Sequence, residues 1–312
     1  MKTVKPFHFP VERPPVGRRS AGGFSLVEII IVVGLLSFIM LGLLMMFNQT
    51  QRAFRVSMTQ TDVLESGRAV SALLNGSLEQ MAPSPYGTNT VNFYMTNYGS
   101  SDLPPTLFSL PGNDNAPRTN VMESFYFLSR ENQRWIATGY MVGTPSAGFG
   151  SLYRFVTNCP VSQNPQRLFG EYQERFYRVY TNTDVNTDGI LPKEISRVVD
   201  GVVHFKVRVF DTNGYLITNM IGHAGTGTNI FVDAPNDTYL GGEARQYIFT
   251  DRAVPASVEF EIGVLEDRVL TRLRAIPDSF FQRKQLTNQI SVGALHLFRQ
   301  RVPVYNVDLS AY

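Results

Sequence analysis

The chain has 312 residues, of which 43% are hydrophobic and 17% are charged, and this balance excludes an intrinsically disordered polypeptide. The formal net charge of +2 is uneven: residues 1–23 hold five basic residues against one acidic residue, a net +4, so residues 24–312 carry +2 minus +4, or −2. A general basic surface for DNA or RNA is therefore not expected, and the single cysteine, Cys159, excludes an intramolecular disulfide and a cysteine-based metal site.

An almost wholly apolar run, FSLVEIIIVVGLLSFIMLGLLMMF, occupies residues 24–47. At about 1.5 Å per residue, a helix of this length crosses a hydrocarbon core of about 30 Å. The excess of basic residues before the run predicts a cytoplasmic N-terminus and a C-terminal bulk outside the membrane. An ordinary anchor leaves Glu28 unexplained, because a carboxylate inside an apolar membrane segment needs a partner.

Two other N-terminal signals fit the sequence poorly. The flank after the apolar run, MMFNQTQRAF, lacks the small-residue site of a cleaved secretory signal peptide. A lipoprotein signal needs a cysteine near the end of the run, whereas Cys159 lies far downstream. The run is therefore expected to remain with the mature protein.

The sequence GGFSLVE at residues 22–28 resembles the type IV prepilin motif. The resemblance implies that a prepilin peptidase cuts between Gly23 and Phe24, after the pair Gly22-Gly23, and that Phe24 is methylated. It also implies that the Glu28 carboxylate pairs with the N-terminal ammonium of a neighbouring pilin subunit. The protein would then lie in the bacterial inner membrane, with its C-terminal domain periplasmic or extracellular, and enter a filament on assembly.

The helix is predicted to continue to Ala82, since no proline occurs between Phe24 and Pro83 and apolar residues recur at helical spacing. Gly67, inside this helix, costs about 1 kcal/mol relative to alanine and marks either a bend, a close contact or a tolerated residue. The chain thus divides into a leader at 1–23, the transmembrane half of the helix at 24–47, its extramembrane half at 48–82 and a globular β-rich domain at 83–312.

Beyond the helix, strands are predicted at 124–129 and 135–142. Alternating apolar and polar residues predict two more, at 202–211 and 257–265. Lys206 and Arg208 are expected to pair with Glu259 and Glu261 across a solvated sheet face. Segments rich in Gly, Asn, Pro and Ser predict loops at 83–121 and 223–242, and the tail after Pro277 has a possible helix cap, Asp278, and a strand-like end at 302–307. The predicted fold class is α+β, pilin-like: a long N-terminal helix packed on a mainly antiparallel sheet, with large loop-rich elaborations.

Residues 184–189, DVNTDG, match the first half of a calcium loop. The candidate ligands are Asp184, Asn186, Asp188, Ile190 and Glu194; Glu194 falls one residue before the position at which an EF-hand places its bidentate carboxylate. The alternative is a hairpin turn after a strand ending near residue 180. Calcium loops in the related type II secretion filament proteins favour the metal by resemblance, and no other cofactor is expected.

Catalytic signatures are missing from the sequence. The four histidines are scattered without HExxH spacing, and neither a GxSxG elbow nor a GxGxxG or GxxxxGK[ST] phosphate loop occurs. We therefore do not expect an enzyme.

The expected function is that of a minor pilin or pseudopilin, at the tip or in the initiating complex of a type IV pilus-like or type II secretion filament. The segments VVDGVVHFKVRVFD and PASVEFEIGVLED resemble J-type pseudopilins and W-type minor pilins, and TQRAFRVSMTQTDVLESGRA is similar to prepilin-like proteins of verrucomicrobial gene cassettes. The alternative is an anchored or filament-tip adhesin that binds a ligand through the loops at 83–121 and 223–242.

Overall fold

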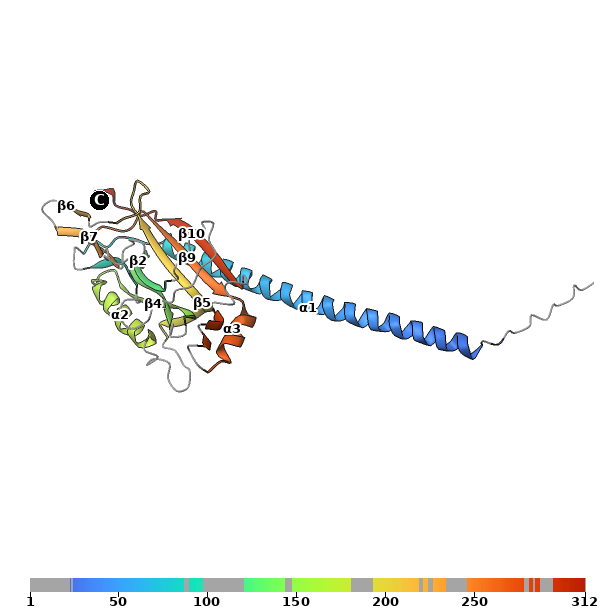
Figure 1. Ribbon diagram of the computed structural model, residues 1–312. Coiled ribbons are helices and arrows are strands. Elements are labelled where there is room, and N and C mark those ends of the chain that lie inside the picture. Colours follow the sequence, from blue (N-terminus) through green and yellow to red (C-terminus); the bar gives the residue numbers. More distant parts are fainter. Residues whose placement is uncertain are drawn as a thin grey trace, which may run out of the picture. The chain divides into compact units, whose positions relative to one another are not determined.

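The computed structural model places the described residues in two compact units, Met1–Arg55 and Val56–Tyr312 (Figure 1). Helix α1, Leu26–Leu78, contributes residues to both units. The residues that the structure describes are 23, 25–86, 90–97, 121–143, 148–180, 193–218, 221–223, 227–233, 246–277, 281–282, 284–286 and 294–311.

The second half of α1 carries one apolar stripe that faces the core of the second unit. Its buried residues follow the three- and four-residue spacing of a helix face: Val63, Gly67, Val70, Leu74 and Leu78. The helix ends four residues before the predicted Ala82 because the chain turns into β structure. Met81 forms an isolated antiparallel bridge with Ser129, and the Ala82 amide donates to the Leu128 carbonyl at 3.0 Å.

A ten-stranded sheet forms the body of the second unit, in the order β10-β9-β5-β4-β3-β2-β1-β8-β7-β6, with antiparallel pairing between all neighbours. The strands are β1 Val91–Asn97, β2 Glu123–Glu131, β3 Arg134–Gly143, β4 Gly150–Pro160, β5 Ile195–Phe210, β6 Ile221–His223, β7 Gly227–Asp233, β8 Gln246–Thr250, β9 Ser257–Leu265 and β10 Leu295–Pro303.

The sheet curls, so that the start of β2 meets the second half of β5. Met122 forms a parallel bridge with Phe205, whose amide donates to the Val121 carbonyl at 2.8 Å. The buried Glu123 carboxylate accepts the Val207 amide. These contacts satisfy backbone groups of β5 beyond the point where its pairing with β4 stops.

Both faces of the sheet are covered. Helix α1 packs on one face, where its buried stripe joins the side chains of Phe93, Phe125 and Phe260 in the largest core cluster. Helix α2, Gln166–Tyr180, covers a second cluster built from β1 to β5, and α3, Asp267–Arg274, covers a third at β5, β9 and β10. A short 3-10 turn, η3, spans Leu309–Ala311 near the C-terminus.

The strands predicted at 124–129, 135–142, 202–211 and 257–265 are confirmed as β2, β3, the second half of β5 and β9. Four other local predictions are wrong. The loop predicted at 83–121 contains β1, and the loop predicted at 223–242 contains β7. The strand-like end predicted at 302–307 has the wrong bounds, because β10 spans Leu295–Pro303 and includes only its first two residues. The segment that ends near Tyr180 is helix α2, not a strand.

The sequence does hold the signal for α2. The Gln166 amide donates to the Asn164 side chain at 2.9 Å, a capping contact just before the helix, and Pro165 follows this cap. Leu168, Phe169 and Tyr172 then bury one face at helical spacing.

Candidate membrane-spanning and assembly segment

Helix α1 begins with a side-chain cap. The Glu28 amide donates to the Ser25 hydroxyl at 3.2 Å and to the Ser25 carbonyl at 3.0 Å. Ser25 therefore occupies the cap position, and Glu28 is the third residue of the first turn, as in the Ser-x-x-Glu capping box. A carboxylate there also interacts favourably with the positive end of the helix dipole.

Interaction with the helix dipole is thus a local role for Glu28, beside the role that the prepilin motif implies. The interaction with the helix dipole requires no second subunit, whereas pairing with an ammonium requires one. The two roles are compatible, because the Glu28 side chain is exposed and forms no ion pair within the part of the chain that the structure describes.

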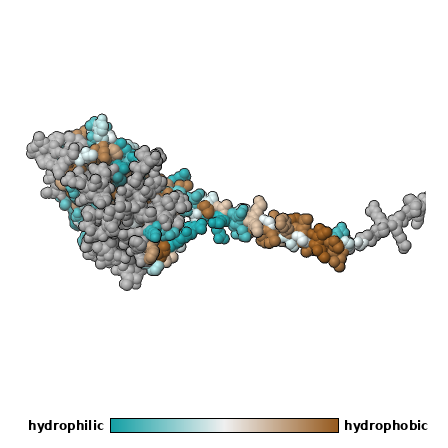
Figure 2. All heavy atoms as spheres, in the orientation of Figure 1, coloured by the Kyte–Doolittle hydropathy of each residue, from teal (hydrophilic) through white to brown (hydrophobic). Residues whose placement is uncertain are grey.

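The large apolar side chains of residues 26–47 are all exposed, each between 50% and 79%. Figure 2 shows the hydrophobic residues gathered along this part of α1. The segment is about 33 Å long at 1.5 Å per residue, so α1 is long and apolar enough to cross a membrane. In water this surface would be strongly unfavourable, at about 25 cal/mol for each Å² of apolar area.

Polar side chains in and beside the apolar segment are satisfied within the helix. Ser37 donates to the Val33 carbonyl at 2.8 Å, and Thr50 donates to the Met46 carbonyl at 2.9 Å. Such bonds to the preceding turn suit a hydroxyl in a medium that offers no water. Glu28 is then the one ionisable side chain between Ser25 and Asn48.

The predicted processing residues are described only in part. Gly23 precedes the helix, and an added Cβ there would meet no atom within 4 Å. Gly22 and Phe24 lie outside the described residues. The proposed cleavage between Gly23 and Phe24 therefore rests on the sequence motif.

The candidate calcium site also lies largely outside the described residues, which omit Asp184, Asn186, Asp188 and Ile190. Glu194 precedes β5, and its carbonyl accepts the Val156 amide at 2.8 Å. Within the described ranges, no group of three or more His, Cys, Asp or Glu side chains could hold a metal ion.

The predicted charge ladder exists between β5 and β9. Lys206 faces Glu261 and Arg208 faces Glu259, and Arg208 Nη1 lies 2.9 Å from Glu259 Oε1. The prediction of a solvated face is wrong, because Glu259 and Glu261 are only 7% and 3% exposed. The side chain of Arg299 on β10 also closes over this face, 2.9 Å from Glu259.

His204 extends this ladder into the core. Its Nδ1 accepts the Val121 amide at 3.1 Å, and its Nε2 lies 3.6 Å from Glu261 Oε1. Both side chains are nearly inaccessible. The ladder therefore joins β5, β9 and β10 to the segment just before β2.

The Cys159 thiol is buried beneath α2, in the cluster that contains Tyr126 and Tyr172. Burial raises the pKa of this thiol, Arg167 lowers it and Glu171 raises it again. A buried, neutral thiol is a poor nucleophile, so Cys159 acts as a small core residue.

No protein-family model matches the sequence, and no curated protein matches it significantly. The loops that an adhesin would use at 83–121 and 223–242 lie largely outside the described residues, apart from β1 and β7.

Proposed function

We propose that this protein is a minor pilin or pseudopilin, a subunit that enters a type IV pilus-like or type II secretion filament through its N-terminal helix. The observation that carries the proposal is the apolar segment 26–47 of α1, whose large apolar side chains are all exposed. This segment begins within the GGFSLVE motif at residues 22–28. The prepilin peptidase, which also methylates the new N-terminus, and other pilin subunits are the partners.

One apolar surface can serve in two environments. Before assembly, residues 26–47 span the inner membrane, with the N-terminus in the cytoplasm and the sheet-containing unit on the outer side. After extraction, the same side chains pack against the equivalent helices of neighbouring subunits, which again removes them from water. A soluble monomer would expose this surface, so the apolar segment favours insertion and assembly over an aqueous role.

Glu28 provides the register between subunits. Once the leader is removed, Phe24 carries the terminal ammonium, and Glu28 lies about one helical turn away on its own chain. In a staggered pair of helices the Glu28 carboxylate of one subunit meets the Phe24 ammonium of the next. A charge pair offsets the cost of burying a lone charge, which reaches about 2.5 to 3.5 kcal/mol at the centre of a membrane and is smaller near the end of the segment, where Glu28 lies.

A position at the tip or in the initiating complex suits the second unit. Within the described residues it holds a ten-stranded sheet, α2, α3 and the second half of α1, which is bulky for a subunit that repeats in a tightly packed shaft. At a tip, only the N-terminal helix must fit the lattice of the filament.

The test of processing is mass spectrometry of the mature N-terminus. We expect the wild-type chain to begin with methylated Phe24, and Gly23→Leu to retain the leader because the peptidase no longer fits its site. Gly34→Leu is the matched control, since an added Cβ meets no atom within 4 Å at either glycine. A mature chain that begins elsewhere would contradict the proposal.

The test of assembly uses Glu28→Gln, which keeps the side-chain shape and a capping oxygen but removes the charge. We expect normal processing and loss of filament assembly or secretion. Glu65→Gln, at an exposed acid further along α1, should assemble normally. Normal assembly of Glu28→Gln would refute the charge pair and leave the processing result untouched.

A further inference from the structure

Strand β10 forms one edge of the sheet and leaves half of its backbone groups facing outward. It pairs with β9 over nine residues, from Leu295 opposite Leu265 to Pro303 opposite Ser257. The bonded positions are the even-numbered ones, as the Val304 amide, which donates to the Ala256 carbonyl at 3.0 Å, indicates. Leu297, Arg299 and Arg301 therefore direct their amides and carbonyls away from β9.

These outward groups form no backbone hydrogen bond in the part of the chain that the structure describes. An open edge of this length is uncommon, because proteins usually shorten or cover such edges. The opposite edge of this sheet illustrates the usual solution, since β6 has only three residues. The β10 edge can therefore accept a further strand.

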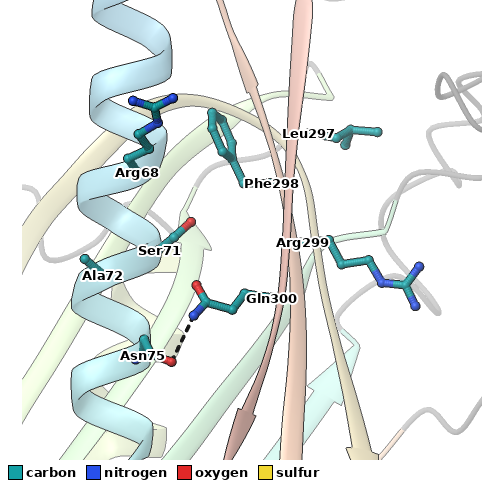
Figure 3. Close-up of a pocket in the computed structure, with 8 residues that line it drawn as sticks. All are labelled: Arg68, Ser71, Ala72, Asn75, Leu297, Phe298, Arg299 and Gln300. Atoms are coloured by element: carbon teal, nitrogen blue, oxygen red, sulfur yellow. Dashed lines mark hydrogen bonds between the residues drawn. The ribbon is translucent and has the colours of Figure 1, made fainter.

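A groove of about 570 Å³ lies between α1 and β10 (Figure 3). Phe298 and Gln300 point toward the helix, and Gln300 Nε2 donates to Asn75 Oδ1 at 3.1 Å. The side chains of Leu297 and Arg299 point away from α1, so these two residues border the groove with their backbone. An added strand would place alternate side chains in this groove, which is polar on its helix side.

Charged side chains and a proline, which commonly protect sheet edges against pairing, are present on β10 but do not cover its outward backbone groups. Arg299 turns onto β9, where it pairs with Glu259, and Arg301 donates from Nε to the Ser257 hydroxyl at 2.8 Å. Pro303 removes one donor, at the last residue of the strand only. The amides of Leu297, Arg299 and Arg301 stay available.

The charge beside the edge is positive. Arg299 and Arg301 follow each other on one face of β10, and both are exposed. Arg68 is exposed at the rim of the groove and makes no ion pair within the described ranges of the chain. A strand with carboxylates at every second position would place them opposite Arg299 and Arg301.

A second copy of this chain is a poor occupant. Contacts of Gly67 with Phe298, of Asn75 with Gln300 and of Met81 with Asn306 show that β10 runs parallel to the second half of α1. Antiparallel pairing of two β10 edges about a twofold axis would therefore point these two helix segments in opposite directions. Heterologous pairing would have to use β6, which is too short.

We propose that β10 accepts an extended, acidic segment of a different polypeptide as an eleventh strand, with its carboxylates against Arg299 and Arg301 and small polar side chains in the groove beside α1. This interaction goes beyond filament entry through the N-terminal helix, and the exclusion of a second copy rests on the proposed function, in which neighbouring helices point the same way.

The test uses the full chain in detergent micelles and a fluorescent synthetic peptide of about nine residues that alternates Glu and Thr. We expect it to bind at least about tenfold more tightly than a Lys-Thr peptide of equal length, because the edge is cationic. Hydrogen exchange should slow at the amides of Leu297, Arg299 and Arg301 and stay unchanged at Phe298 and Gln300, which already bond to β9.

Arg299→Ala and Arg299→Pro separate charge from backbone pairing, because both remove the guanidinium but only proline removes the outward amide. We expect alanine to weaken binding and proline to weaken it at least about threefold further, as loss of one more hydrogen bond predicts. Should Arg299→Pro unfold, Arg301→Ala and Arg301→Pro provide the same comparison.

Any of three peptide-binding results would overturn the proposal: no binding of the Glu-Thr peptide, equal binding of the Glu-Thr and Lys-Thr peptides, or equal affinity of the alanine and proline variants. Self-association of the chain that Arg299→Pro abolishes would do so as well, by assigning the edge to a second copy.

Discussion

Gly67 is the residue at which α1 approaches the sheet most closely. An added Cβ would lie 2.1 Å from the ring atoms Cε2 and Cζ of Phe298. The sequence predicted a bend, a close contact or a tolerated glycine at position 67, and the structure supports the close contact. The Phe298 ring fills the space that a side chain at position 67 would need. This contact explains why a glycine stands inside the helix despite its low helix propensity.

We predict that Gly67→Ala destabilises the wild-type chain by about 1 to 3 kcal/mol, because the Phe298 ring must leave its place. In a Phe298→Ala background the same change should stabilise by up to about 1 kcal/mol, since alanine is the better helix former. Denaturant unfolding of the full chain in detergent measures both values. Stabilisation in the wild-type background would show that the ring moves freely.

Tyr126 is a fully buried tyrosine beneath α2. Its hydroxyl makes no hydrogen bond within the described residues. Burial raises the pKa of Tyr126 well above its ordinary value, and the neighbouring Cys159 and Glu171 raise it further. Because the pKa in the unfolded chain is about 10, the stability associated with the neutral phenol is complete below that pH and is lost as pH rises toward the folded-state pKa.

We predict that Tyr126→Phe raises the free energy of unfolding by about 1 kcal/mol at neutral pH, because it removes a buried hydroxyl without a partner. The variant should also lose less stability than wild type between pH 9 and pH 11. The control is Tyr94→Phe in the same cluster, which removes a hydroxyl bonded to Gln246 Nε2 at 3.0 Å and should cost about 1 kcal/mol. A destabilised Tyr126→Phe would contradict this account.

At the scale of elements, the ladder between β5 and β9 shows what a strand pattern predicts well. Alternating apolar residues placed Lys206 and Arg208 on the same face as Glu259 and Glu261, and the structure pairs them in register. The pattern could not predict their burial, because β10 and the curl that brings β2 to β5 come from distant parts of the chain.

We predict that Glu259→Gln lowers the free energy of unfolding by about 2 to 4 kcal/mol, since it leaves Arg208 and Arg299 without their shared carboxylate. Removal of an exposed ion pair should lower the free energy of unfolding far less. Arg167→Ala breaks the contact of Arg167 with Glu171 on α2, at 3.3 Å, and should cost less than about 0.5 kcal/mol. Similar losses for the two variants would show that burial does not strengthen the ladder.

At the scale of the whole molecule, the positive charge belongs to the leader. If cleavage follows Gly23, the mature chain carries a net charge of −2 rather than +2, because residues 1–23 hold a net +4. The positive charge of the leader then orients the chain in the membrane, with its N-terminus in the cytoplasm. Cysteine labelling can test the resulting topology, since the one native cysteine is buried.

We predict that Tyr305→Cys reacts with a membrane-impermeant maleimide in intact spheroplasts, because Tyr305 is 72% exposed on the unit proposed to lie outside. The wild-type chain should stay unlabelled even after lysis. Glu12→Cys in the uncleaved Gly23→Leu chain should label only after lysis. The reverse pattern would contradict the proposed orientation.

Features that depend on local composition could be predicted from the sequence: an apolar segment long enough to cross a membrane, four strands, two of them with a period of two, and the charge partners on those two strands. The pilin-like assignment also rests on local residues, from Gly22 to Glu28, and stays a proposal. Local signals suffice here because length, hydrophobicity and alternation act within one segment.

The neighbours of each segment, and the backbone groups that remain open, could be known only from the fold. In the fold, β1 and β7 lie in two regions predicted as loops, Glu259 and Glu261 are buried, and β10 forms an edge of the sheet. The physical reason is that sheet order and burial arise from pairing between residues far apart in the chain. A local pattern reports which face of a strand is apolar, but not what lies beside it.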